Sequence, residues 1–279
     1  MTYKSLFTVL TDPELDLSVL PQAAALARQY EAHLDVLCLG IDSSQSGYYF
    51  AGANAMILQE ALTRASAEAQ ALEGAAQAWL GKTDLLWNTE AAMAQAGDLG
   101  RFVAGHGRFS DLVILPQPYG KNRGIDQEAV IEGALFGAQA PVLVLPEGVT
   151  AQAAPRRVAI AWNESPEALR TVRAALPLLK SAERVTVVVI DPPVHGPNRS
   201  DPGGLLSQYL SRHGVKVEID ILSRSMPRVS DVLSRACTDM AADLLVMGAY
   251  GHSRFREAIL GGATRDMLEE APLPVFMAH

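Results

Sequence analysis

The sequence predicts an α/β protein made of two doubly wound, five-stranded parallel sheets, and three observations support this prediction. Short apolar runs alternate with longer amphipathic segments along the whole chain. The runs are rich in Val, Ile and Leu, which suits strands buried on both faces of a parallel sheet. The pattern occurs twice, and a chain of 279 residues exceeds the usual size of one domain.

Ten apolar runs are predicted to be strands, five in each half of the chain. Those of the first half are residues 4–11, 34–40, 84–89, 111–115 and 142–145. Those of the second half are residues 157–162, 184–190, 215–222, 243–247 and 274–278. Amphipathic helices separate them, and Ser165 is predicted to cap a helix whose first residue is Pro166. Right-handed crossovers between such strands give an open, doubly wound sheet in each half.

The two halves of the chain correspond closely, which indicates an internal repeat. The sequence DLVIL at 111–115 matches DLLVM at 243–247, and PVLV at 141–144 matches PVFM at 274–277. These offsets are 132 and 133 residues, so the final third of each half is in register. We therefore predict that both halves have the same fold.

The first half is longer than the second by one insertion. The opening strands correspond at an offset near 152, so the first half carries about twenty extra residues. They are predicted to lie within residues 42–80, which include a long alanine-rich helical stretch. Residues 146–155 have the composition of a linker. The predicted domains are thus residues 1–146 and residues 156–279.

Composition excludes several functional classes. The net charge is 23 − 31 = −8, which argues against a nucleic-acid binder because such proteins rely on clustered Lys and Arg. No apolar run approaches the roughly eighteen residues of a membrane span, and no signal peptide is recognised. Cys38 and Cys237 lie in segments typical of a buried strand and a helix, without metal-binding spacing. We expect a cytoplasmic protein with two reduced core cysteines and no membrane insertion.

A glycine-rich loop follows the fourth strand of the second half. Gly248-x-x-Gly251 ends that strand, and Gly261 comes before a predicted helix. Glycines let backbone N–H groups approach an anion closely, and a helix N-terminus adds partial positive charge. Such loops at strand ends are typical of phosphate binding, although tight turns and helix packing are an alternative explanation for the glycines.

The second half resembles the universal stress protein family. The resemblance rests on the first strand with its polar end (Arg157 to Ser165), on Gly248-x-x-Gly251-x9-Gly261, and on the terminal strand at 274–277. The glycine element is similar to the family's ATP-binding signature, and the whole chain resembles the tandem form of the family. The resemblance implies an adenine nucleotide alpha hydrolase-like sheet in each half, with strand order 3-2-1-4-5 and nucleotide between strands 1 and 4.

The resemblance also implies which residues contact an adenine nucleotide. Asn163 ends the first strand and Ile190 ends the second, where the family contacts the adenine. The remaining candidates belong to the glycine loop and the helix after it: Gly248, Gly251, His252, Arg254, Gly261, Gly262, Ala263 and Thr264. Arg254 can neutralise phosphate charge, although a solvated surface arginine is an equal alternative. His252 is better explained as a hydrogen-bonding loop residue than as an acid or base.

The chain departs from the family pattern at three places. Gly262 stands where the family has Ser or Thr, and the hydroxyl of Thr264 is the expected substitute. Asn163 stands where the family usually has Asp, and it keeps both an acceptor and a donor for the base. In the first half the equivalent loop contains Pro116 and Pro118, which lack N–H donors. We therefore expect the first half to bind no nucleotide.

The sequence favours a regulatory nucleotide-binding protein over an enzyme. It has no P-loop, nucleophile elbow or HExxH motif, so no catalytic or metal-ligating residue is assigned. The expected cofactor is ATP, alone or with Mg²⁺, acting as a ligand that shifts conformation. The alternatives are an interaction scaffold that binds no nucleotide and a very slow nucleotide hydrolase. By resemblance the two halves form an intramolecular pseudo-dimer through their last strands, and a homodimer of the chain stays open.

Overall fold

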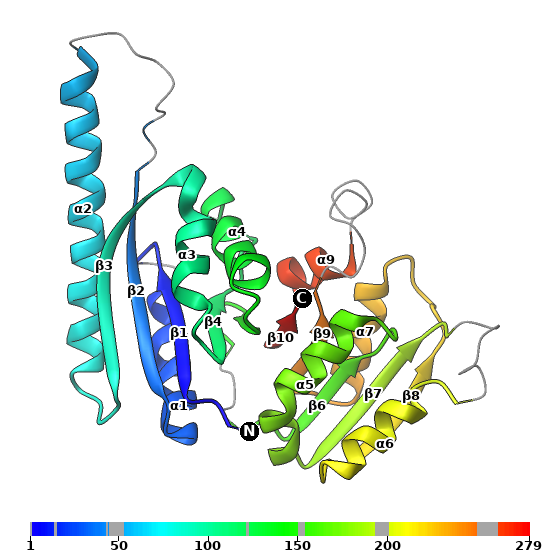
Figure 1. Cartoon of the computed structure of the whole chain (residues 1–279). Coiled ribbons are helices and arrows are strands. Elements are labelled where there is room, and N and C mark those ends of the chain that lie inside the picture. Colours follow the sequence, from blue (N-terminus) through cyan, green and yellow to red (C-terminus); the bar gives the residue numbers. More distant parts are fainter. Residues whose placement is uncertain are drawn as a thin grey trace. The chain divides into compact units, whose positions relative to one another are not determined.

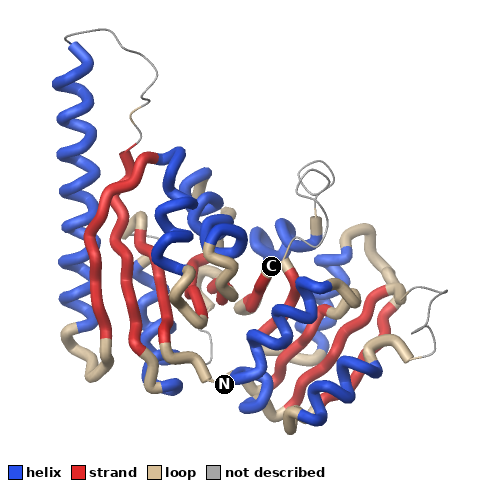
Figure 2. Tube along the Cα trace, in the orientation of Figure 1, coloured by secondary structure: helices blue, strands red, loops and turns tan. Residues whose placement is uncertain are grey.

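The computed structural model describes residues 2–13, 16–42, 44, 53–120, 123–149, 154–192, 201–249 and 262–279. The chain forms two compact units. The first unit is Tyr3–Ala140, and the second is Pro141–His279 together with Met1–Thr2. Each unit has a largely parallel sheet with helices packed on it (Figures 1 and 2). This agrees with the predicted α/β class.

Among its described residues, the first unit contains four parallel strands in the order β3-β2-β1-β4 (Figure 1). The strands are β1 (Ser5–Leu10), β2 (His33–Asp42), β3 (Trp87–Gln95) and β4 (Leu112–Pro116). The longer helices are α1 (Leu20–Tyr30), α2 (Ala53–Leu80), α3 (Leu99–Gly107) and α4 (Ile125–Glu132). Short helical turns are η1 (Leu17–Val19), η2 (Ala96–Asp98) and η3 (Gly133–Gly137).

The second unit contains the five parallel strands of the second repeat in the order β8-β7-β6-β9-β10. They are β6 (Arg157–Ala161), β7 (Arg184–Ile190), β8 (Val217–Leu222), β9 (Leu244–Gly248) and β10 (Val275–Ala278). The described helices are α5 (Pro166–Ser181), α6 (Gly204–Arg212), α7 (Val229–Asp239) and α9 (Ala263–Glu270). One further strand, β5 (Val142–Leu145), pairs antiparallel with β10.

The predicted strand order 3-2-1-4-5 is confirmed in the second unit, and its first four places are confirmed in the first. The structure adds the antiparallel pairing of β5 with β10, in which Val144 lies opposite Val275. This pairing gives β10 a partner on its outer edge, which would otherwise expose unpaired backbone groups. It also groups β5 with the second compact unit, so these units divide after Ala140, while the domain bounds 1–146 and 156–279 stay a prediction.

In the first unit, the insertion is helical as predicted, whereas the third strand lies further along the chain than predicted. The alanine-rich insertion forms α2, a helix of 28 residues that extends beyond β2 and β3 in Figure 1. The third strand was predicted at 84–89 but occupies Trp87–Gln95. Its second half contains alanines instead of branched apolar residues, yet it pairs with β2 along nine residues.

Among the described helices, α2 included, none is long and apolar enough to cross a membrane.

Helix α2 packs tightly against β2 because of one glycine. Its buried residues fall on one stripe of the helix: Ala65, Ala69, Leu72, Ala76 and Leu80. Gly40 of β2 lies under this stripe, and a Cβ atom there would overlap the backbone carbonyl of Ala65. The helix therefore approaches the strand through a glycine and small alanines, which fixes the register of the insertion on the sheet.

Replacing Gly40 with Ala should destabilise the first unit, because the new methyl group has backbone rather than a movable side chain as its neighbour. We expect a loss of about 1–3 kcal/mol or more in the free energy of unfolding, measured by urea denaturation. Gly74→Ala is the matched control in α2, since no atom lies within 4 Å of the added methyl. It should raise stability by about 0.5–1 kcal/mol. Equal effects of the two changes would contradict this packing.

Candidate functional site

The candidate site of the second unit lies where two strand connections diverge. Strand β6 pairs in parallel with β7 on one side and with β9 on the other. The chain passes from β6 to β7 but from β9 to β10, so these connections leave the sheet in opposite directions. Open α/β sheets bind ligands at such a switch point, outside the carboxyl ends of the strands. The register of Ala161 with Met247 places Asn163 level with Ala249 at this edge.

Gly248 allows the first turn of α5 to lie over the end of β9. A Cβ atom at Gly248 would lie 2.6 Å from the backbone nitrogen of Ala168 and 3.0 Å from the carbonyl carbon of Glu167. The helix begins here because Ser165 caps it, accepting a hydrogen bond from the Ala168 N–H at 3.1 Å. The positive end of the helix dipole is thereby held at the switch point. Helix packing alone therefore accounts for this glycine.

Asn163 and Ile190 end neighbouring strands at the same edge. The register of Ala161 with Val188 places Ile190 level with Asn163. The side chain of Asn163 is exposed, and its amide oxygen accepts a hydrogen bond from the Ser165 N–H at 3.2 Å. Asn163 thus shapes the turn into α5. Ile190 is partly exposed, as a residue forming the wall of a crevice would be.

The predicted residues Gly262, Ala263 and Thr264 form the start of α9. Gly262 is the N-cap residue, with extended backbone angles (φ −81°, ψ 148°) that any residue can adopt. Thr264 is 4% exposed, so it faces the interior of the unit more than solvent. The helix is anchored to α7 because Ser230 donates a hydrogen bond to Asp266 at 2.8 Å. A second helix N-terminus thus follows β9 on the same side of the sheet as α7.

An ion-pair cluster holds the same two helices together on the surface. The guanidinium of Arg228 pairs with Asp231 at 2.7 Å and with Glu270 at 2.9 Å. Hydrogen bonds to these carboxylates, Glu270 first and Asp231 second, raise the pKa of Arg228 above its ordinary value. Because the cluster is exposed to solvent, its effect on stability is small, and its role is to fix the position of α9.

Four predicted site residues lie outside the residues that the structure describes: Gly251, His252, Arg254 and Gly261. Their roles therefore stay predictions. The structure brings the other six candidates to the carboxyl edge of the sheet of the second unit, on strand ends and at one helix start. Strand β9 thus precedes the loop and helix α9 follows it, in the predicted order.

One residue at this edge was missed by the sequence analysis. Glu167 lies in the first turn of α5, and its Oε2 atom is buried without a hydrogen-bond partner among the described residues. The backbone of Glu167 lies against Gly248. The sequence signal that could have identified Glu167 is its place two positions after the predicted N-cap, because acidic side chains in the first turn complement the helix dipole. Glu167 thus belongs to the helix turn that lies against the end of β9.

The described residues offer neither a cluster of metal ligands nor a reactive thiol. No group of three or more His, Cys, Asp or Glu side chains there could hold a metal ion. Cys38 and Cys237 are both free and buried, as predicted. Burial raises the pKa of each thiol to about 12, so neither supplies a thiolate near neutral pH.

The first unit has a small cavity at the equivalent switch point. Strand β1 lies between β2 and β4, and Pro116 occupies the place that Gly248 has in the second unit. The cavity measures about 10 Å³, far below the roughly 300–1,000 Å³ of common small-molecule sites. Its wall includes apolar side chains of β1, β4 and α4: Val9, Leu115, Val130 and Ile131. The expectation that the first half binds no nucleotide stays a prediction.

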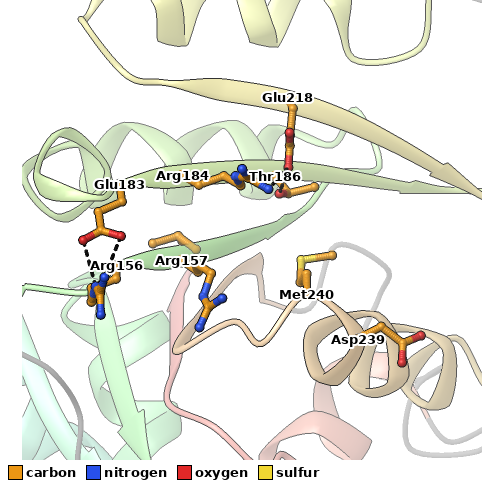
Figure 3. Close-up of a pocket in the computed structure, with 9 residues that line it drawn as sticks. Arg156, Arg157, Glu183, Arg184, Thr186, Glu218, Asp239 and Met240 are labelled. Atoms are coloured by element: carbon orange, nitrogen blue, oxygen red, sulfur yellow. Dashed lines mark hydrogen bonds and ion pairs between the residues drawn. The ribbon is translucent and has the colours of Figure 1, made fainter.

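A larger hollow of about 490 Å³ lies at the opposite, amino-terminal edge of the second unit (Figure 3). Arg156 makes two hydrogen bonds to Glu183, at 2.8 and 3.0 Å. Glu218 accepts a hydrogen bond from Thr186 at 3.0 Å and lies 3.7 Å from Arg184. These arginines and acids largely pair with one another at the surface, and they lie away from the strand ends that form the switch point. We therefore do not include this hollow in the candidate site.

Comparison with known proteins connects this geometry to one family. Residues 155–279 match the model of the universal stress protein family. A universal stress protein of Synechocystis sp. is 32% identical over 98 residues. That match covers 32% of this chain and 33% of the relative, so the chain aligns with about a third of that protein's length.

Two solved structures resemble the chain over nearly its whole length. A universal stress protein from Archaeoglobus fulgidus has a TM-score of 0.66 and 15% identity, covering 98% of this chain and 95% of that one. A putative universal stress protein from Pseudomonas aeruginosa has a TM-score of 0.60 and 14% identity, covering 99% and 93%. At these identities the likeness establishes the shared fold, including its two-domain form.

Replacing Gly248 with Ala should destabilise the second unit even without any ligand, because the methyl group meets the backbone of α5. We expect the free energy of unfolding to fall by about 1–3 kcal/mol in nucleotide-free protein, measured by urea denaturation. Gly105→Ala is the control, since a methyl group there has no neighbour within 4 Å. If Gly248→Ala leaves stability unchanged, close helix packing is not the reason for this glycine.

Proposed function

We propose that this chain, whose residues 155–279 belong to the universal stress protein family, is a stress-response protein that binds an adenine nucleotide in its second unit. The observation that carries the proposal is the position of the α5 N-terminus. Gly248 lets that helix lie over the carboxyl end of β9, at the switch point between β6 and β9. The positive end of the α5 dipole there favours a ligand that carries negative charge.

The chemistry of the edge fits the parts of a nucleotide. Asn163 offers an amide near the end of β6, and the partly exposed Ile190 offers an apolar surface next to it. These groups suit an adenine ring, which needs both a flat apolar contact and hydrogen bonds. The phosphates are assigned to the loop from Gly251 to Gly261 and to the start of α9 at Gly262. ATP, alone or with Mg²⁺, is the proposed ligand.

We propose that the nucleotide acts as a ligand rather than as a substrate. Binding that favours one conformation of the loop would couple nucleotide concentration to a partner or to activity elsewhere. Slow hydrolysis is the second candidate, because a carboxylate oxygen of Glu167 that has no hydrogen-bond partner in the described part of the chain lies in the first turn of α5. The form of nucleotide recovered from the protein distinguishes these two functions. An interaction scaffold without nucleotide is the remaining alternative.

Purified protein should release an adenine nucleotide on denaturation, identified by chromatography and mass spectrometry. Gly261→Phe should bind ATP at least about tenfold more weakly than wild type in calorimetry, since about 1.4 kcal/mol of lost phosphate contact suffices. Gly97→Ala in the first unit is the control, because its added methyl group has no neighbour within 4 Å. Release of ATP fits a ligand, whereas release of ADP alone fits a hydrolase. No release together with no calorimetric signal from Mg-ATP would overturn the proposal.

Replacing Gly262 with Ser should strengthen nucleotide binding and also stabilise α9. The extended backbone at Gly262 accepts a serine without strain. Its hydroxyl can cap the helix, worth a few tenths of a kcal/mol, and can donate to a phosphate. Calorimetry should show a lower Kd for ATP, while Gly262→Ala should not. If serine and alanine change the Kd equally, position 262 does not contact the phosphates.

A further inference from the structure

The turn after β1 in the first unit holds a buried carboxylate at the switch point. Strand β1 pairs with β2 and β4, and its register with β4 places Thr11 just beyond the paired ends. Thr11 thus occupies the place that Asn163 has in the second unit. The chain then turns so that Asp16 reaches back to this point. Asp16 is 2% exposed.

One oxygen of Asp16 accepts three hydrogen bonds from this turn. Its Oδ2 accepts from the Thr11 N–H at 2.6 Å, from the Thr11 hydroxyl at 2.9 Å and from the Asp12 N–H at 2.9 Å. Two consecutive backbone N–H groups and a hydroxyl that converge on one oxygen form an anion-binding arrangement. The same edge of the sheet is where α/β proteins bind external anions.

No basic residue is among those that line the cavity at Asp16. Its second oxygen, Oδ1, is buried and has no hydrogen-bond partner among the described residues. The charged group that acts on it is the like charge of Asp12. The cavity wall is otherwise apolar apart from Thr11 and the neutral Gln127. Burial disfavours the ionised form of Asp16 and raises its pKa. The hydrogen bonds from the turn act in the opposite direction and favour the ionised form.

The second unit closes the corresponding turn without a charge. There the neutral amide oxygen of Asn163 accepts a hydrogen bond from the Ser165 N–H. The carboxylate of Glu167 makes no hydrogen bond to this turn among the described residues. Each unit therefore has its own switch point of the same kind. In the first unit, however, a carboxylate of the chain itself accepts hydrogen bonds from the N–H groups of the turn.

We propose that the turn at Thr11 and Asp12 is a binding site for a small carboxylate anion, which the chain fills with its own Asp16. The first unit is thus closed to external anions by an internal ligand. Removing the carboxylate should leave the three donors free, and because the adjoining cavity measures only about 10 Å³, the vacated space suits only a small anion. This proposal concerns the first unit alone and does not depend on nucleotide binding by the second.

Chemical rescue of Asp16→Ala by formate tests the site. Alanine keeps the Cβ atom, so formate replaces the removed atoms. The variant should have a lower thermal unfolding midpoint than wild type, because three buried donors lose their acceptor. Sodium formate should recover most of this loss in a saturable manner, whereas sodium chloride at equal ionic strength should not. Wild type and Asp16→Asn, which keep an acceptor oxygen, should gain no more from formate than from chloride.

A direct measurement keeps the test decisive if Asp16→Ala folds poorly. In Asp16→Ser, the amide NMR signals of Thr11 and Asp12 should shift on titration with formate and saturate. Refolding yield of Asp16→Ala should likewise rise in formate but not in chloride. Equal rescue by chloride, or amide signals that do not respond to formate, would overturn the proposal. Either result would leave Asp16 as a side chain that only caps the turn.

Discussion

The constraint on which the structure depends is the position of the first strand of each repeat. That strand pairs with the second strand on one side and with the fourth on the other, in both units. All of these pairings are parallel, so the carboxyl ends meet at one edge. Connections then leave in opposite directions and open a switch point. This pairing places the start of α5, the turns after β1 and β6, and the cavity beside Asp16.

The two repeats complete the same switch point with different side chains. In the second unit, Gly248 admits the first turn of α5, and the neutral Asn163 shapes the turn. In the first unit, Pro116 replaces that glycine and the Asp16 carboxylate takes the N–H donors of the turn. A charged internal group costs desolvation and repels external anions, whereas a helix N-terminus attracts them. The two repeats thus differ at this edge of the sheet. In the second unit a helix N-terminus there suits an anion, whereas in the first unit the Asp16 carboxylate already occupies the turn.

The sequence pattern was sufficient for the strands, the repeat and the edge that carries the candidate site, whereas the strand order came from the resemblance to the universal stress protein family. Runs of Val, Ile and Leu mark strands buried on both faces, and nine of the ten runs lie within two residues of the observed strands. The exception is β3, an edge strand whose alanines lack the branched side chains typical of a buried strand. Asp16 could not be predicted because its partner turn lies upstream in a segment without periodicity. The packing role of Gly248 likewise depends on a helix that only the fold brings near.

The most direct test of this account is the number of adenine nucleotides that one chain binds. Native mass spectrometry of the intact protein at saturating ATP counts them, and hydrogen exchange locates them. We predict one nucleotide per chain, with exchange slowed in residues 244–264 and around Asn163, and unchanged at Thr11 and Asp12. Two nucleotides per chain, or slowed exchange at the first-unit turn, would contradict an edge closed by Asp16. The absence of any bound nucleotide would contradict the function proposed for the second unit.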